Sequence, residues 1–549
     1  MAPILPIRHQ APLALERFIR AEPPGADAID LDVLFVGGGP AGLAGAIELA
    51  RLARLDGSVG EPAIGVLEKA GALGEHSLSG AVVNPRVFRE LFPDLPEREL
   101  PFRQRVEREE VRVLTPRGGF RIPTPPTMRN HGNYVASLCE IVRWLGEKAE
   151  AAGVNVFTGF PADHLLVEGT RVRGVRTAAS GLDREGRPGD GYQPPTDLAA
   201  KVTVLAEGTR GSLSQAWQRW RDVPGQNPQI FALGVKEVWR VARPLRHVVH
   251  TMGWPLPRSA FGGTFMYPMG TDQVALGLVA GLDAPDTAFD VHELLQRMKL
   301  HPFFRHYLED GELLEWGAKT IPEGGYWSVP SRLSGDGLLL AGDAAGLVDV
   351  ASLKGIHYAM QSGLYAARAA FQALKAGDSS EAGLAAYDRT VRESYILSDL
   401  RTTRNMRLAF KHGFWRGGIE SGLMTITRGA FPGRRIPARE DAAEPRRPLP
   451  QRAAPLRPDG RLTFSKVDAV FKSGNATRDS IPSHLLVGPE VTGEVAEFYA
   501  RLCPAGVYER AGDGLRVSPS NCVDCKATDV LGPRWTPREG GSGPKYRLM

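Results

Sequence analysis

The 549-residue sequence has only four cysteines, no long apolar run and almost no excess of one charge. Four cysteines are too few for a disulfide scaffold, and three of them stand near the end of the chain, which favours a metal site in a reducing compartment. No segment approaches the ~20 apolar residues that a spanning helix needs, so we expect any membrane contact to be peripheral or monotopic. The net charge of +5 comes from 67 basic and 62 acidic residues, a bias too small to indicate nucleic-acid binding.

A glycine-rich turn early in the chain predicts a dinucleotide-binding unit. Residues 32–36 (DVLFV) have the composition of a buried strand and precede an Ala- and Leu-rich helix. The turn between them consists of Gly37, Gly38, Gly39, Pro40, Ala41 and Gly42. Gly37 permits the tight turn, Gly39 lets the backbone approach a pyrophosphate, and Gly42 lets helix and strand pack closely. A second strand, AIGVLE, ends in Glu68, which is placed to bind a ribose hydroxyl.

A second turn, far along the chain, favours FAD over NAD. Residues 337–341 (GLLLA) predict a strand that runs into Gly342 and Asp343, and a helix is expected over 356–375. A carboxylate at a helix N-terminus is suited to a ribityl or ribose hydroxyl, while the helix amides face the flavin. An N-capping role for Asp343 is the alternative, but the pairing with the first unit favours the flavin.

The middle of the chain predicts an antiparallel sheet beside the nucleotide domain. Residues 261–269 (FGGTFMYPM) and 273–282 (QVALGLVAGL) have the composition of strands joined by a turn. Gly262 and Gly263 are costly inside a strand, and such a pair indicates either a bulge or the close approach of a ligand. The pattern favours neither reading over the other.

The C-terminal cysteines have the spacing of a metal or cluster site. Cys503 is followed by a proline, and Cys522 and Cys525 form a CxxC pair farther along. Two thiolates at this spacing and a third elsewhere can share one zinc ion or one iron–sulfur cluster. We favour the cluster because a proline beside a cysteine ligand recurs in ferredoxins and because a flavoprotein needs a one-electron relay.

From about residue 31 onward the chain closely resembles the electron transfer flavoprotein–ubiquinone oxidoreductase family. The strings that carry the resemblance include VGGGPAGLAGAIELA, GVKEVWRV, HTMGWPL, FGGTFMY, IPEGGYWSVP, LKGIHYAMQSG, CPAGVYE and NCVDCK. The resemblance implies that FAD binds at Gly37, Gly39, Gly42 and Glu68. It also implies that a quinone binds at Gly262 and Gly263, near Ser79 of the SLSGA string, and that Cys503, Cys522 and Cys525 hold a cluster.

Two positions depart from the family pattern. Thr528 stands where the last cluster cysteine should be, so we expect [4Fe–4S] with one non-cysteine site, and [3Fe–4S] as the alternative. Thr528 and Asp529 are the favoured oxygen donors, because Asp524 lies between two ligating cysteines, where its side chain should point away. The Gly342-Asp343 pair looks more like related flavin reductases and hydroxylases.

These observations predict an α/β flavoprotein with a Rossmann-type, glutathione-reductase-like FAD domain. We assign 31–215 and 328–400 to that domain, 216–327 to an antiparallel quinone-side sheet, 401–460 to a membrane-facing and connecting segment, and 461–549 to a ferredoxin-like iron–sulfur segment. We expect a membrane-associated dehydrogenase that passes electrons from reduced electron transfer flavoprotein, through the cluster and FAD, to a quinone. No catalytic acid, base or nucleophile is predicted.

The sequence also predicts a membrane location and leaves two alternative functions open. Apolar residues at helical spacing in 84–95 and 413–432 suggest monotopic attachment to an inner membrane, on its cytoplasmic or matrix side, although a core helix is the simpler reading of 84–95. The alternative function is an FAD-dependent reductase or hydroxylase acting on an isoprenoid or aromatic substrate, with a structural C-terminal metal. A docking subunit without redox function is a third reading, which the intact glycine turn disfavours.

Overall fold

A largely parallel sheet forms the first layer of the computed structural model, which describes residues 3–80, 82–448 and 454–549. Residues 449–453 of the predicted connecting segment lie outside the described part. The parallel strands run in the order β21, β14, β2, β3 and β9. Their bounds are Leu338–Leu340, Asp197–Leu205, Ile29–Val36, Ile64–Glu68 and Asn155–Thr158. The sheet is extended by β1 (Ile19–Arg20), β10 (Ala162–Glu168) and β11 (Arg171–Thr177).

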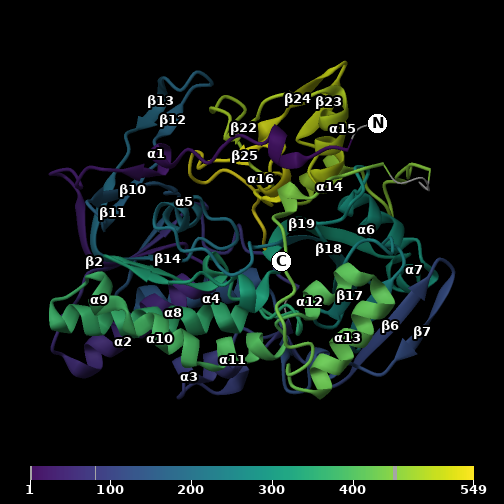
Figure 1. Cartoon of the computed structure of the whole chain (residues 1–549), viewed down its shortest axis with the longest axis horizontal. Helices are drawn as coiled ribbons and strands as arrows, with labels where there is room; N and C mark the ends of the chain where they lie inside the picture. Colours follow the sequence, from purple (N-terminus) through teal and green to yellow (C-terminus); the bar gives the residue numbers. More distant parts are fainter. Residues whose placement is uncertain (1–2, 81, 449–453) are drawn as a thin grey trace.

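Two long helices lie side by side against this sheet (Figure 1), α2 (Pro40–Asp56) and α8 (Ile356–Ala376). Glycines let them approach closely, because a Cβ on Gly363 of α8 would lie 2.1 Å from the carbonyl oxygen of Ala41 in α2. A Cβ on Gly45 would lie 2.9 Å from the carbonyl oxygen of Gly363. The contact joins residues 31–215 to residues 328–400, the two stretches that the sequence predicts to form one unit. The other helices of this half among the described residues are α1 (Leu15–Phe18), α3 (Arg86–Leu91), α4 (Leu138–Ala151), α5 (Ser212–Trp220), α9 (Glu381–Leu384), α10 (Ala386–Glu393) and α11 (Tyr395–Thr402).

A second sheet of seven strands runs in the order β19, β15, β18, β17, β16, β6 and β7. Their bounds are Glu312–Pro322, Phe231–Arg240, Gln273–Gly281, Gly262–Pro268, Val248–Gly253, Glu109–Thr115 and Gly118–Ile122. The expectation of an antiparallel sheet confined to 216–327 was wrong in two respects: β6 and β7 come from within 31–215, and β6 pairs with β16 in parallel. A short hairpin forces the two strands that it joins to pair in antiparallel fashion. No hairpin joins β6 to β16, so these two strands can pair in parallel. Helices α6 (Val291–Lys299) and α7 (Pro302–Leu308) follow β18.

The C-terminal segment packs on the second sheet and shares its apolar core. Its helices are α14 (Lys466–Phe471), α15 (Gly493–Leu502) and α16 (Ala527–Leu531), and its strand pairs are β22 (Leu485–Leu486) with β25 (Arg534–Trp535) and β23 (Tyr508–Ala511) with β24 (Gly514–Val517). The N-terminal residues run past this segment (Figure 1), and Gln10 pairs with Val487.

The two segments expected at a membrane differ in burial. In α3, Val87, Phe88 and Leu91 are buried in the main core, so the core reading of 84–95 is correct and the membrane reading is wrong. By contrast, α12 (Met406–Ala409) leads to α13 (Phe414–Ile426), on which apolar side chains are exposed. No helix among the described residues is long and apolar enough to cross a bilayer.

Candidate functional site

The first glycine turn forms a cradle at the start of α2. A Cβ on Gly37, whose φ is +118°, would lie 2.3 Å from the carbonyl oxygen of Ala206, and one on Gly42 would lie 2.1 Å from that of Gly37. Gly39 has no neighbouring atom within 4 Å of such a Cβ, so a ligand can reach its backbone. Because Gly39 caps α2 without a side-chain hydrogen bond, the first amides of the helix are suited to a pyrophosphate.

Glu68 is fixed at the end of β3 by two backbone amides. The Gly38 N–H donates to its Oε2 at 2.9 Å, and the Ala70 N–H donates to its Oε1 at 2.8 Å. The carboxylate faces the same cavity as Gly37 and Gly39. This placement beside the cradle is the one that a ribose-binding acid requires.

Asp343 faces the cavity from the opposite half of the FAD unit. It lies in a single 3-10 turn, η5 (Gly342–Ala345), and accepts a hydrogen bond from the Thr209 hydroxyl at 3.3 Å. Burial raises the pKa of Asp343 to about 6. It does not cap α8, which begins at Ile356 after Gly355, so the predicted turn is separate from the long helix.

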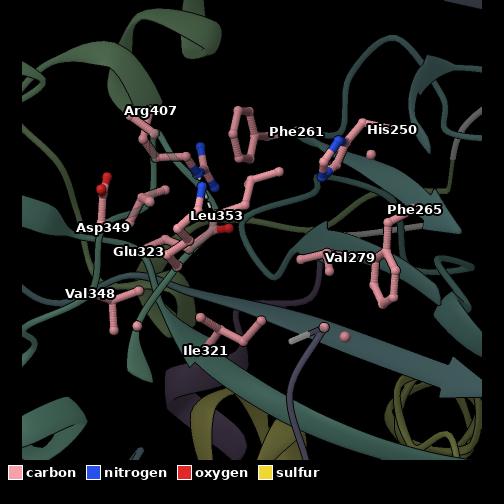
Figure 2. A pocket seen from close by; sticks show the side chains of 18 of the residues that line it. His250, Phe261, Phe265, Val279, Ile321, Glu323, Val348, Asp349, Leu353 and Arg407 are labelled. Carbon is pink, nitrogen blue, oxygen red and sulfur yellow. Dashed lines mark hydrogen bonds and ion pairs between the residues drawn. The ribbon is translucent and has the colours of Figure 1, made fainter. Parts of the chain in front are cut away.

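One continuous cavity of about 1380 Å³ runs from the glycine cradle to the second sheet. This exceeds the ~300–1,000 Å³ of a typical small-molecule site, and it suits a dinucleotide together with a second ligand. Ser79, Gly262 and Gly263 line it together with Gly37 and Glu68. Its far end is mainly apolar (Figure 2), with side chains that include Phe261, Phe265, Val279, Ile321, Val348 and Leu353.

Gly262 and Gly263 begin β17 rather than interrupt it. A Cβ on Gly262, whose φ is +150°, would lie 2.1 Å from the carbonyl oxygen of Val279 on the neighbouring strand. The backbone of β18 is therefore the close neighbour that requires a glycine at position 262. A Cβ on Gly263 would meet only the Thr251 carbonyl oxygen, at 2.9 Å. Both glycines still line the cavity.

The three C-terminal cysteines converge and are buried. Cys503 ends α15, while Cys522 and Cys525 flank a loop, and their side chains interact electrostatically with one another. Burial, with repulsion from Asp524, raises the pKa of Cys522 to about 12. A convergent set of three buried thiols fits a cluster, and cluster assembly must displace their protons.

The position expected for a fourth cysteine holds a threonine in this chain. Thr528 is buried, and its Oγ1 lies 3.3 Å from the hydroxyl of Tyr508. Asp529 is not available as a ligand, contrary to expectation, because Arg210 binds its Oδ2 and the Trp535 N–H donates to its Oδ1 at 2.9 Å. Arg210 is far from Asp529 in sequence, so no local pattern announces this pair.

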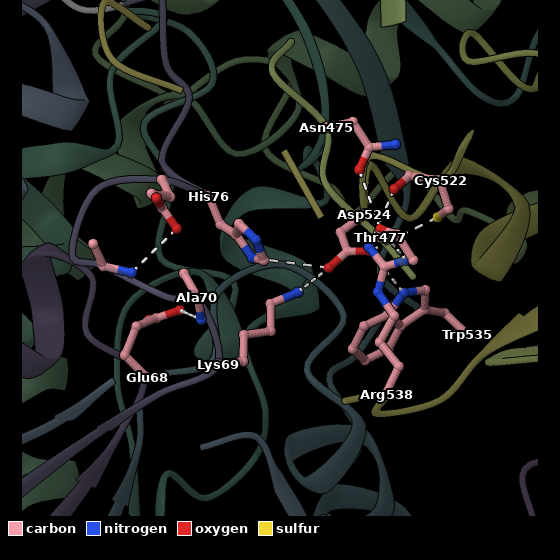
Figure 3. A network of polar contacts seen from close by, with 12 residues as sticks. Glu68, Lys69, Ala70, His76, Asn475, Thr477, Cys522, Asp524, Trp535 and Arg538 are labelled. Carbon is pink, nitrogen blue, oxygen red and sulfur yellow. Dashed lines mark hydrogen bonds and ion pairs between the residues drawn. The ribbon is translucent and has the colours of Figure 1, made fainter. Parts of the chain in front are cut away.

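Asp524 connects the cysteine loop to the FAD unit (Figure 3). Its Oδ2 lies 2.5 Å from Lys69 Nζ and 3.8 Å from His76 Nδ1. Its Oδ1 accepts hydrogen bonds from Arg538 at 2.8 Å and from Trp535 Nε1 at 3.2 Å. Burial opposes the charge, but the positive charges of Arg538 and Lys69 outweigh it and hold the pKa of Asp524 well below its usual range.

Family models match three parts of the chain. They are described as "FAD binding domain" over 66–234, "ETF-QO, ubiquinone-binding" over 231–321, and "Electron transfer flavoprotein-ubiquinone oxidoreductase, 4Fe-4S" over 460–547. The mitochondrial electron transfer flavoprotein-ubiquinone oxidoreductase of Oryza sativa subsp. japonica is 36% identical, over 96% of this chain and 94% of that protein. The Homo sapiens protein of the same name is 35% identical, over 95% and 90%.

The chain belongs to the electron transfer flavoprotein–ubiquinone oxidoreductase family. It is an oxidoreductase that uses FAD and an iron–sulfur cluster, and the predicted combination of cofactors is confirmed. The α/β fold with an FAD-binding domain is also confirmed. A geranylgeranyl bacteriochlorophyll reductase-like structure from Thermoplasma acidophilum aligns with a TM-score of 0.54 at 20% identity, covering 74% of this chain and 97% of that one. That likeness concerns the fold alone.

Within this member of the ubiquinone oxidoreductase family, sequence reasoning missed several residues at the site. Lys69 and His76 stand close to Glu68 in sequence, but nothing in their spacing indicates a partner near the cysteines. His484 stands apart from the cysteines in sequence, with no spacing that indicates a metal site, yet a ring nitrogen lies within 4.8 Å of the ligand atoms of Cys522 and Asp524. Burial and the charge of Arg538 keep the pKa of His484 well below its usual range, so the ring is neutral beside the cysteine loop.

Proposed function

We propose that this chain accepts electrons from a reduced electron transfer flavoprotein and delivers them in pairs to a quinone held in the large cavity. When bound, the cluster and the flavin supply the electron-carrying chemistry, and the protein sets their spacing and surroundings. The observation that carries the proposal is the continuity of the three sites. The cysteine loop is joined to the end of β3 through Asp524 and Lys69, and the flavin cradle and Gly263 share one cavity.

A different set of residues would hold each of the three groups, namely FAD, the cluster and the quinone. Gly37, Gly39, Glu68 and Asp343 would hold FAD, because the first three form an open cradle with a fixed acid and the last faces it across the cavity. The thiols Cys503, Cys522 and Cys525 would hold the cluster, with Thr528 at its fourth corner. Gly262, Gly263 and Ser79 would border the quinone.

The proposed division of the chain follows the prediction with one change. We keep 31–215, apart from β6 and β7, and 328–400 as the FAD unit, 401–460 as the membrane-facing and connecting segment and 461–549 as the iron–sulfur segment. The quinone side is 216–327 together with β6 and β7, since these strands complete its sheet.

We place the membrane surface at α13, which supports monotopic attachment to an inner membrane, on the cytoplasmic or matrix side. Trp415, Ile419 and Ile426 are 71%, 67% and 80% exposed, and all three also line the large cavity. Phe431, beyond the helix, is 55% exposed. A contiguous exposed apolar face is typical of an interfacial helix, and here it would let an apolar quinone pass from the bilayer into the cavity.

Reconstitution tests the proposal directly. Purified protein in quinone-containing liposomes should oxidise reduced electron transfer flavoprotein and form quinol, and its electron paramagnetic resonance spectrum should contain a cluster signal. Direct oxidation of NAD(P)H by the pure protein, with no quinol formed from the flavoprotein donor, would instead support the reductase or hydroxylase alternative.

A further inference from the structure

Reduction of a quinone consumes two protons as well as two electrons, yet the far end of the cavity is mainly apolar. Glu323 and Arg407 are charged groups that face this end (Figure 2). A general acid must lie within hydrogen-bond reach of the atom it protonates, so an acid in this wall is a candidate for proton supply.

Arg407 holds two carboxylates that come from the ends of two strands. Its Nε donates to Glu323 Oε2 at 2.6 Å, and its Nη2 donates to Asp283 Oδ1 at 2.9 Å. Glu323 follows β19, and Asp283 follows β18. The guanidinium also lies 4.1 Å from the ring centroid of Phe261, the residue before Gly262. The ion pair is therefore built into the wall beside the proposed quinone position.

A third carboxylate and a second guanidinium complete the cluster of charges. Asp441 is buried, and its Oδ2 accepts the Phe231 N–H at 2.8 Å. The buried Arg446 donates to the backbone carbonyl oxygens of Ala284 and Asp441. Arg407 is thus bonded to Glu323 and Asp283, while Asp441 bonds a backbone amide and feels the charges of Arg446 and Arg407 through space.

The count of charges indicates that this cluster stores a proton. An unpaired charge is expensive to bury, so three acids facing two cations favour one protonated carboxyl. Burial, together with repulsion from Asp283, raises the pKa of Asp441 to about 7, and burial also raises the pKa of Glu323. The positive charge of Lys411 favours the ionised form of Asp283, and the negative charge of Glu444 favours the ionised form of Arg446.

We propose that Glu323 donates protons to the bound quinone and that the cluster of Glu323, Arg407, Asp283, Asp441 and Arg446 is its proton store. The inference rests on the quinone site placed in this cavity. In each transfer the O–H bond of the Glu323 carboxyl breaks and an O–H bond forms on the quinone, while the two electrons come from the established reaction. The carboxylate that remains is paired with Arg407 and takes up the next proton from solvent.

The discriminating variant is Glu323→Gln, which keeps an oxygen to accept the Arg407 Nε–H but cannot donate a carboxyl proton. The holoenzyme in liposomes, reduced by its donor and mixed with ubiquinone, should form quinol on the order of 10²-fold more slowly. The rate should recover as the pH is lowered, because solvent then supplies protons. FAD content, cluster signal and reduction by the donor should be unchanged.

Two further variants keep the test decisive. Glu323→Asp retains an acid and should restore most of the quinol rate. Glu315→Gln alters another buried acid of the second sheet, which binds the Arg547 and Leu548 amides and does not line the cavity, and it should leave the rate unchanged.

Three outcomes would overturn the inference: equal rates and pH profiles for Glu323→Gln and the parent, a loss confined to quinone KM, or equal slowness of Glu323→Asp and Glu323→Gln. A parent enzyme that accepts electrons but forms no quinol would refute the proposed function itself, a result distinct from equal rates.

Discussion

The ammonium group of Lys69 lies 2.5 Å from the carboxylate of Asp524, which joins the end of β3 to the loop between two cluster cysteines. Lys69 directly follows Glu68, so a residue next to the proposed ribose contact is paired with a residue flanked by two proposed cluster ligands. The electrostatics of the cluster site and the position of the flavin site are thereby linked through one ion pair.

Charge at this pair should set the reduction potential of the cluster. Asp524→Asn removes a buried negative charge and should raise the potential by about 60 mV or more, since ~59 mV is a tenfold change for one electron. Lys69→Met should lower it. Potentiometric titration followed by electron paramagnetic resonance measures both, and Asp513→Asn, at an exposed position of the same segment, is the control. Shifts of the same sign in the two variants would contradict this account.

Thr528 should determine how well the cluster retains its fourth iron. A threonine hydroxyl is a poor ligand for a soft iron–sulfur site, so the parent should lose iron on exposure to air. Thr528→Cys should retain more iron under the same conditions, with unchanged FAD content. Thr528→Val keeps the shape and removes the oxygen, and it should lose iron faster than the parent. Zinc or no metal in anaerobically purified parent protein would refute the assignment.

Glu68 should contribute to FAD retention. Glu68→Ala removes the proposed ribose contact and frees two amides, those of Gly38 and Ala70, that the carboxylate now binds. A charge-assisted hydrogen bond contributes about 1.5–3 kcal/mol, so the dissociation constant for FAD should rise on the order of 10–100-fold. Fluorescence titration of the apoprotein measures it, with exposed Glu61→Ala as the control. A full complement of flavin in purified Glu68→Ala would argue against this role.

The two cavity glycines should respond differently to a methyl group. Gly263→Ala brings a Cβ to 2.9 Å from the Thr251 carbonyl oxygen, so β16 must shift slightly, but the backbone at 263 is not in the left-handed region. The variant should therefore lose little stability, bind FAD and show a raised KM for quinone. Gly262→Ala places a side chain 2.1 Å from the Val279 carbonyl oxygen at a φ of +150°, so it should lower the melting temperature instead. Unaltered quinone kinetics in Gly263→Ala would remove the reason for placing the quinone there.

Attachment at α13 should depend on its exposed apolar face. Ile419→Glu and Ile426→Glu place charges at the proposed bilayer contact and should reduce the fraction of protein that floats with anionic liposomes at low salt. Leu55→Glu, at a position 71% exposed on α2, is the matched control. Parent protein that stays in the soluble fraction would exclude this membrane contact.

The parts predicted correctly from sequence are those whose signal is local. The strand, turn, helix and second strand around Gly37 and Glu68 follow directly from composition and order, and the structure places them as expected.

The remainder depends on partners that are distant in sequence. The parallel pairing of β6 with β16 joins strands that a long stretch of chain separates, and the Arg210–Asp529 pair has no local signature. For the same reason, the spacing of the cysteines could not indicate that Asp524 pairs with Lys69 or that the Thr528 hydroxyl faces Tyr508.

The close crossing of α2 and α8 bears on how the protein is made. Gly363 covers the face of α2 at Ala41, and β21 completes the edge of the sheet beside β14, yet both belong to residues translated long after the glycine cradle. A nascent chain that has emerged only as far as β19 therefore leaves apolar surface of the first layer uncovered. Stable loading of the flavin has to await synthesis of α8, and until then the unfinished layer is a natural target for chaperones.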